Sequence, residues 1–205
     1  MCKDMSPLEK AIQFHGHICP GLLMGVRAAE IALNYLQFDS DQDEELGAIV
    51  ESDTCGVDAI QAILGCTFGK GNLYFKDYGK MVYTVFNRQN GRAIRIAQKY
   101  DALEHPIMER YRHLKGRELL APEEEIELED VLAQVFEWIM SQPTERLFHW
   151  REVEMPQLNK ARILKSIQCH NCGEGVMQTH AILTEEGLLC PECHLNWRGD
   201  NHVRG

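Results

Sequence analysis

The segment FHGHICPGLLMGVRAAEIAL, residues 14–33, places two histidines and a cysteine at alternate positions directly ahead of an apolar stretch. If residues 15–19 are extended, the side chains of His15, His17 and Cys19 lie on one side, because side chains alternate with a period of two. After Pro20-Gly21 the apolar residues recur at helical spacing, which predicts a core helix of about four turns. The segment therefore predicts candidate metal ligands at the start of a buried helix.

The regions on either side of this segment predict a mixture of helices and strands. Ser6-Pro7-Leu8-Glu9 has the form of a capping box, so a short helix is predicted from there to Gly16. Strands are predicted at 46–52, 72–77, 148–156 and on both sides of an Asn90-Gly91 turn, and further helices near Asp58 and from Pro122. The predicted fold class is α+β, with helices packed on a mixed or antiparallel sheet.

A length of 205 residues allows one hydrophobic core, or one core plus a small satellite domain, and 44% hydrophobic with 25% charged residues indicates an ordinary globular protein. No apolar run approaches the roughly 20 residues of a membrane helix, and the opening MCKDMSPLEK is too polar for a signal peptide, so we expect a cytoplasmic protein that does not enter membranes. The net charge of −10 disfavours nucleic acid as a partner. Residues 151–205 carry only −1 of this charge, and basic partners remain possible at the C-terminal end.

Four of the eight cysteines stand in two pairs near the C-terminus, Cys169-x2-Cys172 and Cys190-x2-Cys193. Two such pairs supply the four thiolates of a closed structural zinc site. We therefore predict a four-cysteine zinc finger over 161–205 and a core domain over 1–160. The sequence CPECH at 190–194 also fits the haem attachment pattern, but the upstream pair and the lack of an export signal favour zinc.

Cys55 strengthens the metal interpretation of the first segment. It lies within a turn of the helix predicted near Asp58, where the helix dipole and free N–H groups favour a thiolate. His15, His17, Cys19 and Cys55 are thus the candidate ligands of a transition metal, zinc or a similar ion, and His17, Cys19 and Cys55 are the candidate catalytic residues. The alternative is structural: the histidines end a helix while Cys19 packs in the core.

Three blocks in order, H-x-H-x-C-P-G at 15–21, C-G-x-D-A-I-Q at 55–61 and G-C-T-x-G-x-G at 65–71, are followed by the four-cysteine ribbon. In this arrangement the chain resembles the FmdE family, which takes its name from formylmethanofuran dehydrogenase. The resemblance implies an α+β core with a Cys/His metal cluster, an appended zinc ribbon and a tightly intertwined homodimer. In this sequence the resemblance assigns the metal cluster to His15, His17, Cys19 and Cys55, with Cys66 as an outer member. It assigns the ribbon ligands to Cys169, Cys172, Cys190 and Cys193.

The function expected from these observations is that of a metal-binding protein whose core site catalyses a reaction or senses a metal. The family name refers to a complex that reduces carbon dioxide onto methanofuran, and a link to that metabolism is implied by the resemblance. Two alternatives remain open. The finger and the basic segment NKARILK, residues 159–165, could bind protein or RNA, or Cys19 and Cys55 could form a metal-free redox pair.

Overall fold

The computed structural model describes residues 5–37, 45–158 and 164–201. The chain divides into two compact units, Met1–Lys160 and Ala161–Gly205, here called the core domain and the finger. Most of the basic segment at 159–165 lies outside the described residues. Within the described residues, no helix is long and apolar enough to cross a membrane.

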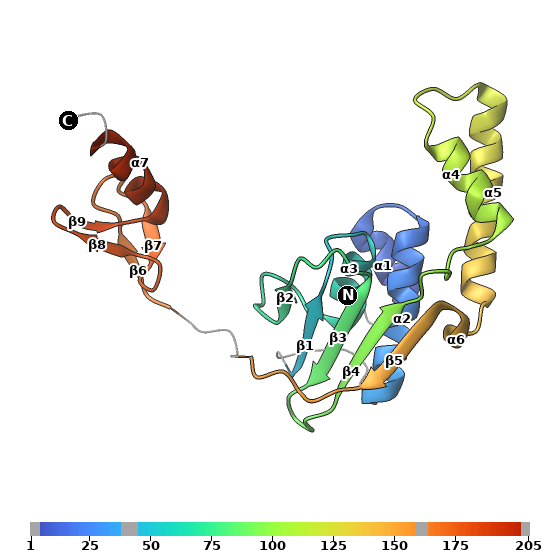
Figure 1. Ribbon diagram of the computed structural model, residues 1–205, viewed down its shortest axis with the longest axis horizontal. Coiled ribbons are helices and arrows are strands. Elements are labelled where there is room, and N and C mark those ends of the chain that lie inside the picture. The colour runs from blue at the N-terminus through green and yellow to red at the C-terminus, as the bar shows by residue number, and fades with distance from the viewer. Residues whose placement is uncertain (1–4, 38–44, 159–163, 202–205) are drawn as a thin grey trace. The chain divides into compact units, whose positions relative to one another are not determined.

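The core domain contains a five-stranded sheet in the order β2-β1-β3-β4-β5 (Figure 1). β1 pairs in parallel with β2 and antiparallel with β3, and β4 and β5 continue the sheet antiparallel. The predicted α+β class with a mixed sheet is therefore confirmed. The strands are β1 (Leu46–Val50), β2 (Leu73–Phe75), β3 (Val82–Asn87), β4 (Ala93–Gln98) and β5 (Phe148–Glu152).

One face of the sheet packs on the helices α1 (Pro7–His15), α2 (Pro20–Leu36) and α3 (Gly56–Leu64). Figure 1 shows α2 running behind the strands. Strand alternation explains the packing, because Tyr83, Val85, Ile94 and Ile96 join the helical core. Phe86, which follows Val85, and Ala93, which precedes Ile94, belong to a separate cluster on the other face, where Val153, Met155 and Leu158 pack against them.

Two glycines set the contact between α2 and α3. A Cβ atom added to Gly25 would lie 2.3 Å from the carbonyl oxygen of Gly56, and one added to Gly56 would lie 2.2 Å from Tyr83 Oη. The backbones of the two helices therefore touch, which no larger residue would permit. This contact brings the N-terminal ends of α2 and α3 together, and these ends carry Cys19 and Cys55.

A helical arm, α4 (Pro106–Lys115) and α5 (Pro122–Ser141), projects from the core domain (Figure 1). Sequence periodicity predicted α5 but not α4. In α4 only Met108 and Leu114 are buried, so its sequence PIMERYRHLK has too few apolar residues for a clear helical period. A single turn, α6 (Thr144–Leu147), leads from the arm into β5.

The finger is built from two hairpins and a helix. β6 (Ser166–Gln168) pairs with β7 (Gly175–Met177), and β8 (Ile182–Thr184) pairs with β9 (Gly187–Leu189), both antiparallel. The helix α7 (Pro191–Asn201) follows. Among the finger residues whose burial the structure describes, the buried hydrophobic cluster consists of Cys169, Leu189 and Cys193. The cysteines are thus the centre of this unit.

Candidate metal centre

The H-x-H-x-C segment is a turn between two helices and not an extended strand. His15 is the last residue of α1, and Gly16 ends that helix with a positive φ of 87°. Cys19 is the N-cap of α2, where its Sγ accepts a hydrogen bond from the Leu22 N–H at 3.4 Å. The turn at Gly16 brings the three side chains together. The predicted grouping is therefore present, but a turn produces it and not an extended segment.

The side chains of His15, His17 and Cys19 form a tight group. One ligand atom from each lies within 4.8 Å of the other two. His15 Nε2 is 3.8 Å from Cys19 Sγ, and the two imidazole rings are 4.4 Å apart between centroids. His17 is exposed whereas His15 and Cys19 are half-buried, so the group faces solvent on one side.

Asp58 holds His15 in place from α3. Its Oδ2 lies 2.7 Å from His15 Nδ1, and the His15 side chain is only 11% exposed. A carboxylate on one ring nitrogen leaves the other free to bind a metal and makes it a better ligand. Sequence patterns assigned Asp58 only to a capping pair with Gln61 and did not predict this role. The one feature of the sequence that could have indicated this role is the position of Asp58, one helical turn after Cys55.

Cys55 lies beside Cys19 but outside the tight group of three ligand atoms. A Cβ atom added to Gly21 would lie 3.9 Å from Cys55 Sγ and 4.0 Å from Cys19 Sγ, so both thiols flank this glycine. Cys55 is the N-cap of α3, which begins at Gly56, two residues before Asp58, and the Cys55 side chain makes no capping hydrogen bond. Its thiol is therefore not committed to the helix end.

The environment of the two thiols is partly desolvated. Burial raises the pKa of Cys19, and the neighbouring Cys55 raises it further, against a lowering by the Leu22 N–H. On α4, burial raises the pKa of Tyr111, and charge on Cys19 and Cys55 adds to the rise. Tyr111 thus lies within electrostatic reach of both thiols, although no sequence pattern singled it out.

Cys66 does not join this site. It is buried just beyond the C-terminal end of α3, whereas Cys55 caps the N-terminal end. A helix of this length separates the two positions by more than about 13 Å. The resemblance implies that Cys66 is an outer member of the cluster. In the structure, Cys66 lies at the opposite end of α3 from Cys55.

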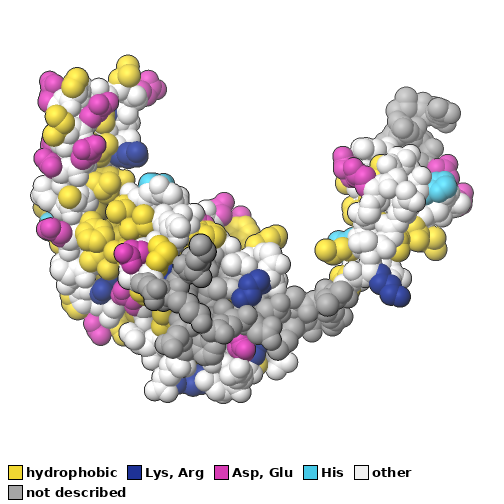
Figure 2. Space-filling view, turned by 180° about the vertical axis from the view of Figure 1, so that it is seen from behind, with side chains coloured by type: hydrophobic (Ala, Val, Ile, Leu, Met, Phe, Trp, Pro, Cys, Tyr) yellow, Lys and Arg dark blue, Asp and Glu magenta, His cyan; other side chains and the backbone are white. Residues whose placement is uncertain are grey.

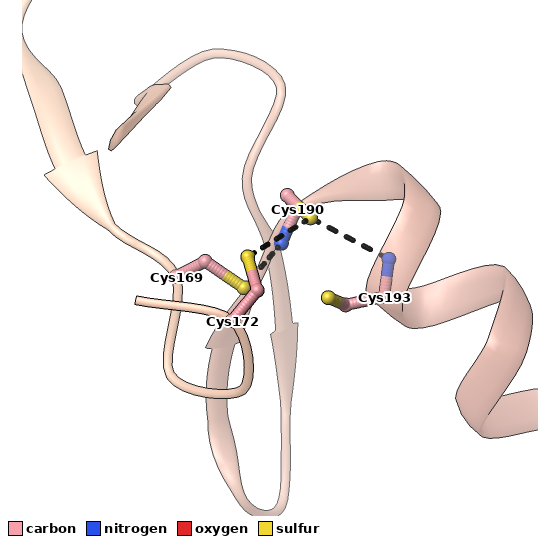
Figure 3. Close-up of side chains that lie close together, drawn as sticks. All are labelled: Cys169, Cys172, Cys190 and Cys193. Atoms are coloured by element: carbon pink, nitrogen blue, oxygen red, sulfur yellow. Dashed lines mark hydrogen bonds between the residues drawn. The ribbon is translucent and has the colours of Figure 1, made fainter. Parts of the chain in front are cut away.

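The four finger cysteines converge as predicted (Figure 3). Cys169 and Cys172 lie in the turn after β6, and Cys190 and Cys193 lie at the start of α7. Cys172 Sγ is 4.0 Å from Cys190 Sγ, and the Cys190 N–H donates to Cys169 Sγ at 3.2 Å. Backbone N–H groups of Cys172 and Cys190 lower the pKa of Cys169 to about 6, whereas the pKa of Cys172, despite a lowering by the Glu174 N–H, is raised by burial and the neighbouring thiols.

Both clusters fit a transition metal by the chemistry of their donors. Four thiols in C-x2-C pairs are a complete tetrahedral set, which is typical of structural sites. Two imidazoles and one thiol are three ligands, with Cys55 close by, which is typical of a site that keeps a coordination position for water or substrate. The described cysteines form no disulfide bonds.

An apolar groove of about 410 Å³ adjoins the core cluster. It is lined by Ile18, which stands between His17 and Cys19, and by Leu132, Ala133 and Phe136 of α5, with Glu129 and Glu137 also in the lining. Figure 2 shows hydrophobic side chains gathered where the arm meets the rest of the core domain. The cluster thus borders a surface that can exclude water.

Comparison with known proteins relates this architecture to one family. The model of the family described as "FmdE, Molybdenum formylmethanofuran dehydrogenase operon" matches residues 14–149. A curated protein of Archaeoglobus fulgidus, named "Probable S-adenosyl-L-methionine-binding protein", is 30% identical over 193 residues, which are 91% of this chain. The chain spans about half of that relative, since the match covers 52% of its length.

A solved structure shows that the fold is shared. It is that of a tungsten formylmethanofuran dehydrogenase FmdE-like protein from Syntrophus aciditrophicus. The two align with a TM-score of 0.61 and 24% sequence identity over 91% of this chain and 89% of that one. The family match covers the core domain from the H-x-H-x-C segment to β5. This chain belongs to the FmdE family.

Proposed function

We propose that the core domain binds a transition metal, zinc or a similar ion, through His15, His17 and Cys19, with Cys55 as a fourth ligand or as a nucleophile. The observation that carries the proposal is the chain of contacts Asp58–His15–Cys19, in which Asp58 holds Nδ1 while Nε2 faces the Cys19 sulfur. A histidine that only ended a helix would need no carboxylate partner on another helix. The pattern is the one that orients metal-binding histidines.

The residues around the site support catalysis or sensing by the metal. A bound metal would act as a Lewis acid on a substrate oxygen or water. The N-terminal ends of α2 and α3 meet at Cys19 and Cys55, and the backbone dipoles there stabilise negative charge. The groove beside Ile18 would shield a substrate from water. A role in formylmethanofuran dehydrogenase-type metabolism is the more specific part of this proposal, and it rests on family membership.

Metal content tests the proposal directly. With a structural zinc on the four finger cysteines, purified protein should contain about two metal ions per chain. Cys19→Ser and Cys55→Ser should each lower the core occupancy, whereas the matched Cys66→Ser should retain both ions. One ion per chain that is unaffected by Cys19→Ser would contradict a core metal. Thiols in that protein that cycle reversibly with oxidant would then favour the redox pair.

We propose that a second copy of the chain covers the apolar groove. The interface of the homodimer implied by the family resemblance would then lie at this groove. The arm carries exposed apolar side chains at Leu119 and Ile126, and the groove lies at its base. Exposed apolar surface of this kind marks interfaces. Phe136→Asp should shift the full chain from dimer to monomer in analytical ultracentrifugation, and the exposed-loop variant Phe68→Asp should not.

A second candidate function, binding of a protein partner through the finger, is favoured by one observation. Leu183 and Leu188 are directly opposite in the β8–β9 hairpin, and both are exposed, Leu183 by 79%. Apolar pairs of this kind on a small charged domain are typical of a protein contact and not of an RNA contact. A Leu183→Ser/Leu188→Ser double variant should lose partners that the whole chain captures while it retains the finger metal. Unchanged capture would argue against this role.

A further inference from the structure

A cavity of about 490 Å³ opens on the sheet face that α1–α3 do not cover. Its lining includes Arg95 and Ala97, which alternate along β4 with the core residues Ile94 and Ile96. Lys80, Lys99 and Tyr100 also line it. The cavity therefore lies across the sheet from the helices and is separate from the candidate metal centre.

Two arginines are directly opposite on neighbouring strands at this face. The antiparallel register of β4 and β5 pairs Arg95 with Arg151, and such partners have Cβ atoms about 4.5–5.5 Å apart on the same face. Like charges in this relation destabilise a sheet. Arg151 is exposed, and within the described residues it forms no ion pair. The arrangement is unfavourable unless an anion lies between the two side chains.

A buried carboxylate fixes one of these arginines. Glu51, whose side chain is 8% exposed, accepts hydrogen bonds from Arg95 Nη2 at 3.0 and 3.2 Å. Both bonds use the same nitrogen, so the donors on Nε and Nη1 remain for another acceptor. The guanidinium is thus held in place while it keeps the capacity to bind an anion.

Positive charge at this cavity exceeds what Glu51 neutralises. Lys80 is exposed and forms no ion pair within the part of the chain that the structure describes. The Lys99 ammonium donates to the carbonyl oxygen of Glu145 at 2.6 Å, which leaves its charge uncompensated. This concentration of cations stands out in a chain of net charge −10.

We propose that this cavity binds a small anionic molecule with a phosphate or carboxylate group, held by Arg95 and Lys80 of its lining and by Arg151, which lies opposite Arg95 on β5. Guanidinium groups bind both kinds of oxyanion through paired hydrogen bonds. The volume is within the roughly 300–1,000 Å³ typical of small-molecule sites. Tyr100, 99% exposed, offers an aromatic ring at the rim against which an apolar part of the ligand could pack. The acidic remainder of the chain disfavours an extended polyanion.

Binding of inorganic pyrophosphate and of citrate to the full-length protein, measured by calorimetry, distinguishes the phosphate from the carboxylate class. Arg151→Gln should weaken binding of the preferred probe at least tenfold. Arg92→Gln is the matched control, since it removes the same charge near the same sheet but from a side chain that stacks on Tyr35. It should weaken binding less than twofold. Equal losses in the two variants, or binding of neither probe at millimolar concentration, would overturn the proposal.

Thermal unfolding supplies a second readout that a purely structural arginine would not give. In anion-free buffer Arg151→Gln should melt at a higher temperature than the parent chain, because the repulsion with Arg95 is relieved. In saturating probe the order should reverse, because the parent chain gains more from binding. A variant that melts lower in both buffers would overturn the proposal. So would a single-stranded RNA that binds more tightly than either probe with the same dependence on Arg151.

Discussion

The core domain buries a continuous hydrophobic cluster that joins α1, α2 and α3 to the sheet, whereas the buried cluster described in the finger is Leu189 with two of the four cysteines. Both units gather cysteine or histidine side chains into a group that fits a metal. In the core domain, the packing of α1, α2 and α3 positions the candidate ligands. Among the finger residues whose burial the structure describes, the cysteines themselves make up most of the buried cluster. The difference is that the same donor chemistry lies on a separate hydrophobic core in one unit and forms the centre of the other.

The largest difference between the two units is expected when metal is removed. With a chelator the finger should lose its structure, because structural zinc contributes on the order of 10 kcal/mol to small domains of this kind. The core domain should keep its cooperative unfolding. Amide signals of β6–β9 and of β1–β5, followed by NMR during chelation, measure the two units in one sample. Simultaneous loss of both sets would contradict the comparison.

Gly25→Ala should have the next largest effect and act on the core domain alone. The new methyl group would lie 2.3 Å from the Gly56 carbonyl oxygen, so α2 and α3 must separate, at a cost of about 2–3 kcal/mol in the free energy of unfolding. Chemical denaturation measures this loss. Gly69→Ala is the control, since a Cβ there meets no atom within 4 Å. A Gly25 variant as stable as its control would show that the helix contact is loose.

Asp58→Asn should weaken the core site without unfolding it. Loss of the carboxylate that orients His15 should lower core metal affinity about 10- to 100-fold, whereas the finger should be unaffected. Competition with a chromogenic chelator measures both sites. Asp53→Asn, on an exposed residue near the same helix, is the control. Equal metal affinity in the two variants would show that Asp58 does not contribute to metal binding at the core site.

The smallest effect is expected at the start of α1. Ser6 and Glu9 form the predicted capping box, in which the Ser6 N–H donates to Glu9 at 2.7 Å. Ser6→Ala should cost about 1 kcal/mol. Because α1 ends at His15, the loss should also appear as faster hydrogen exchange along that helix. Ser6→Asp should restore protection, and a failure to do so would indicate that the cap has no role in positioning His15.

The sequence predicted those features that depend on short spacings. The C-x2-C pairs identified the finger cluster, and the capping box, the apolar period of α2 and the alternation of β3 and β4 identified most of the core domain. It did not predict α4, whose face toward the protein has few apolar residues, or the contact of Asp58 with His15, which joins residues 43 positions apart. Such contacts depend on how helices pack, and one sequence carries no local sign of them.

The glycine contact between α2 and α3 has a consequence for protein engineering. Because two backbones touch at Gly25 and Gly56, the distance between the helix ends that carry Cys19 and Cys55 is fixed by main-chain atoms and not by replaceable side chains. Libraries that repack the hydrophobic core would leave that distance nearly unchanged. For the metal site proposed above, a change in metal preference would therefore have to come from exchanging the candidate ligands themselves, so their contributions could be compared one residue at a time on a fixed backbone.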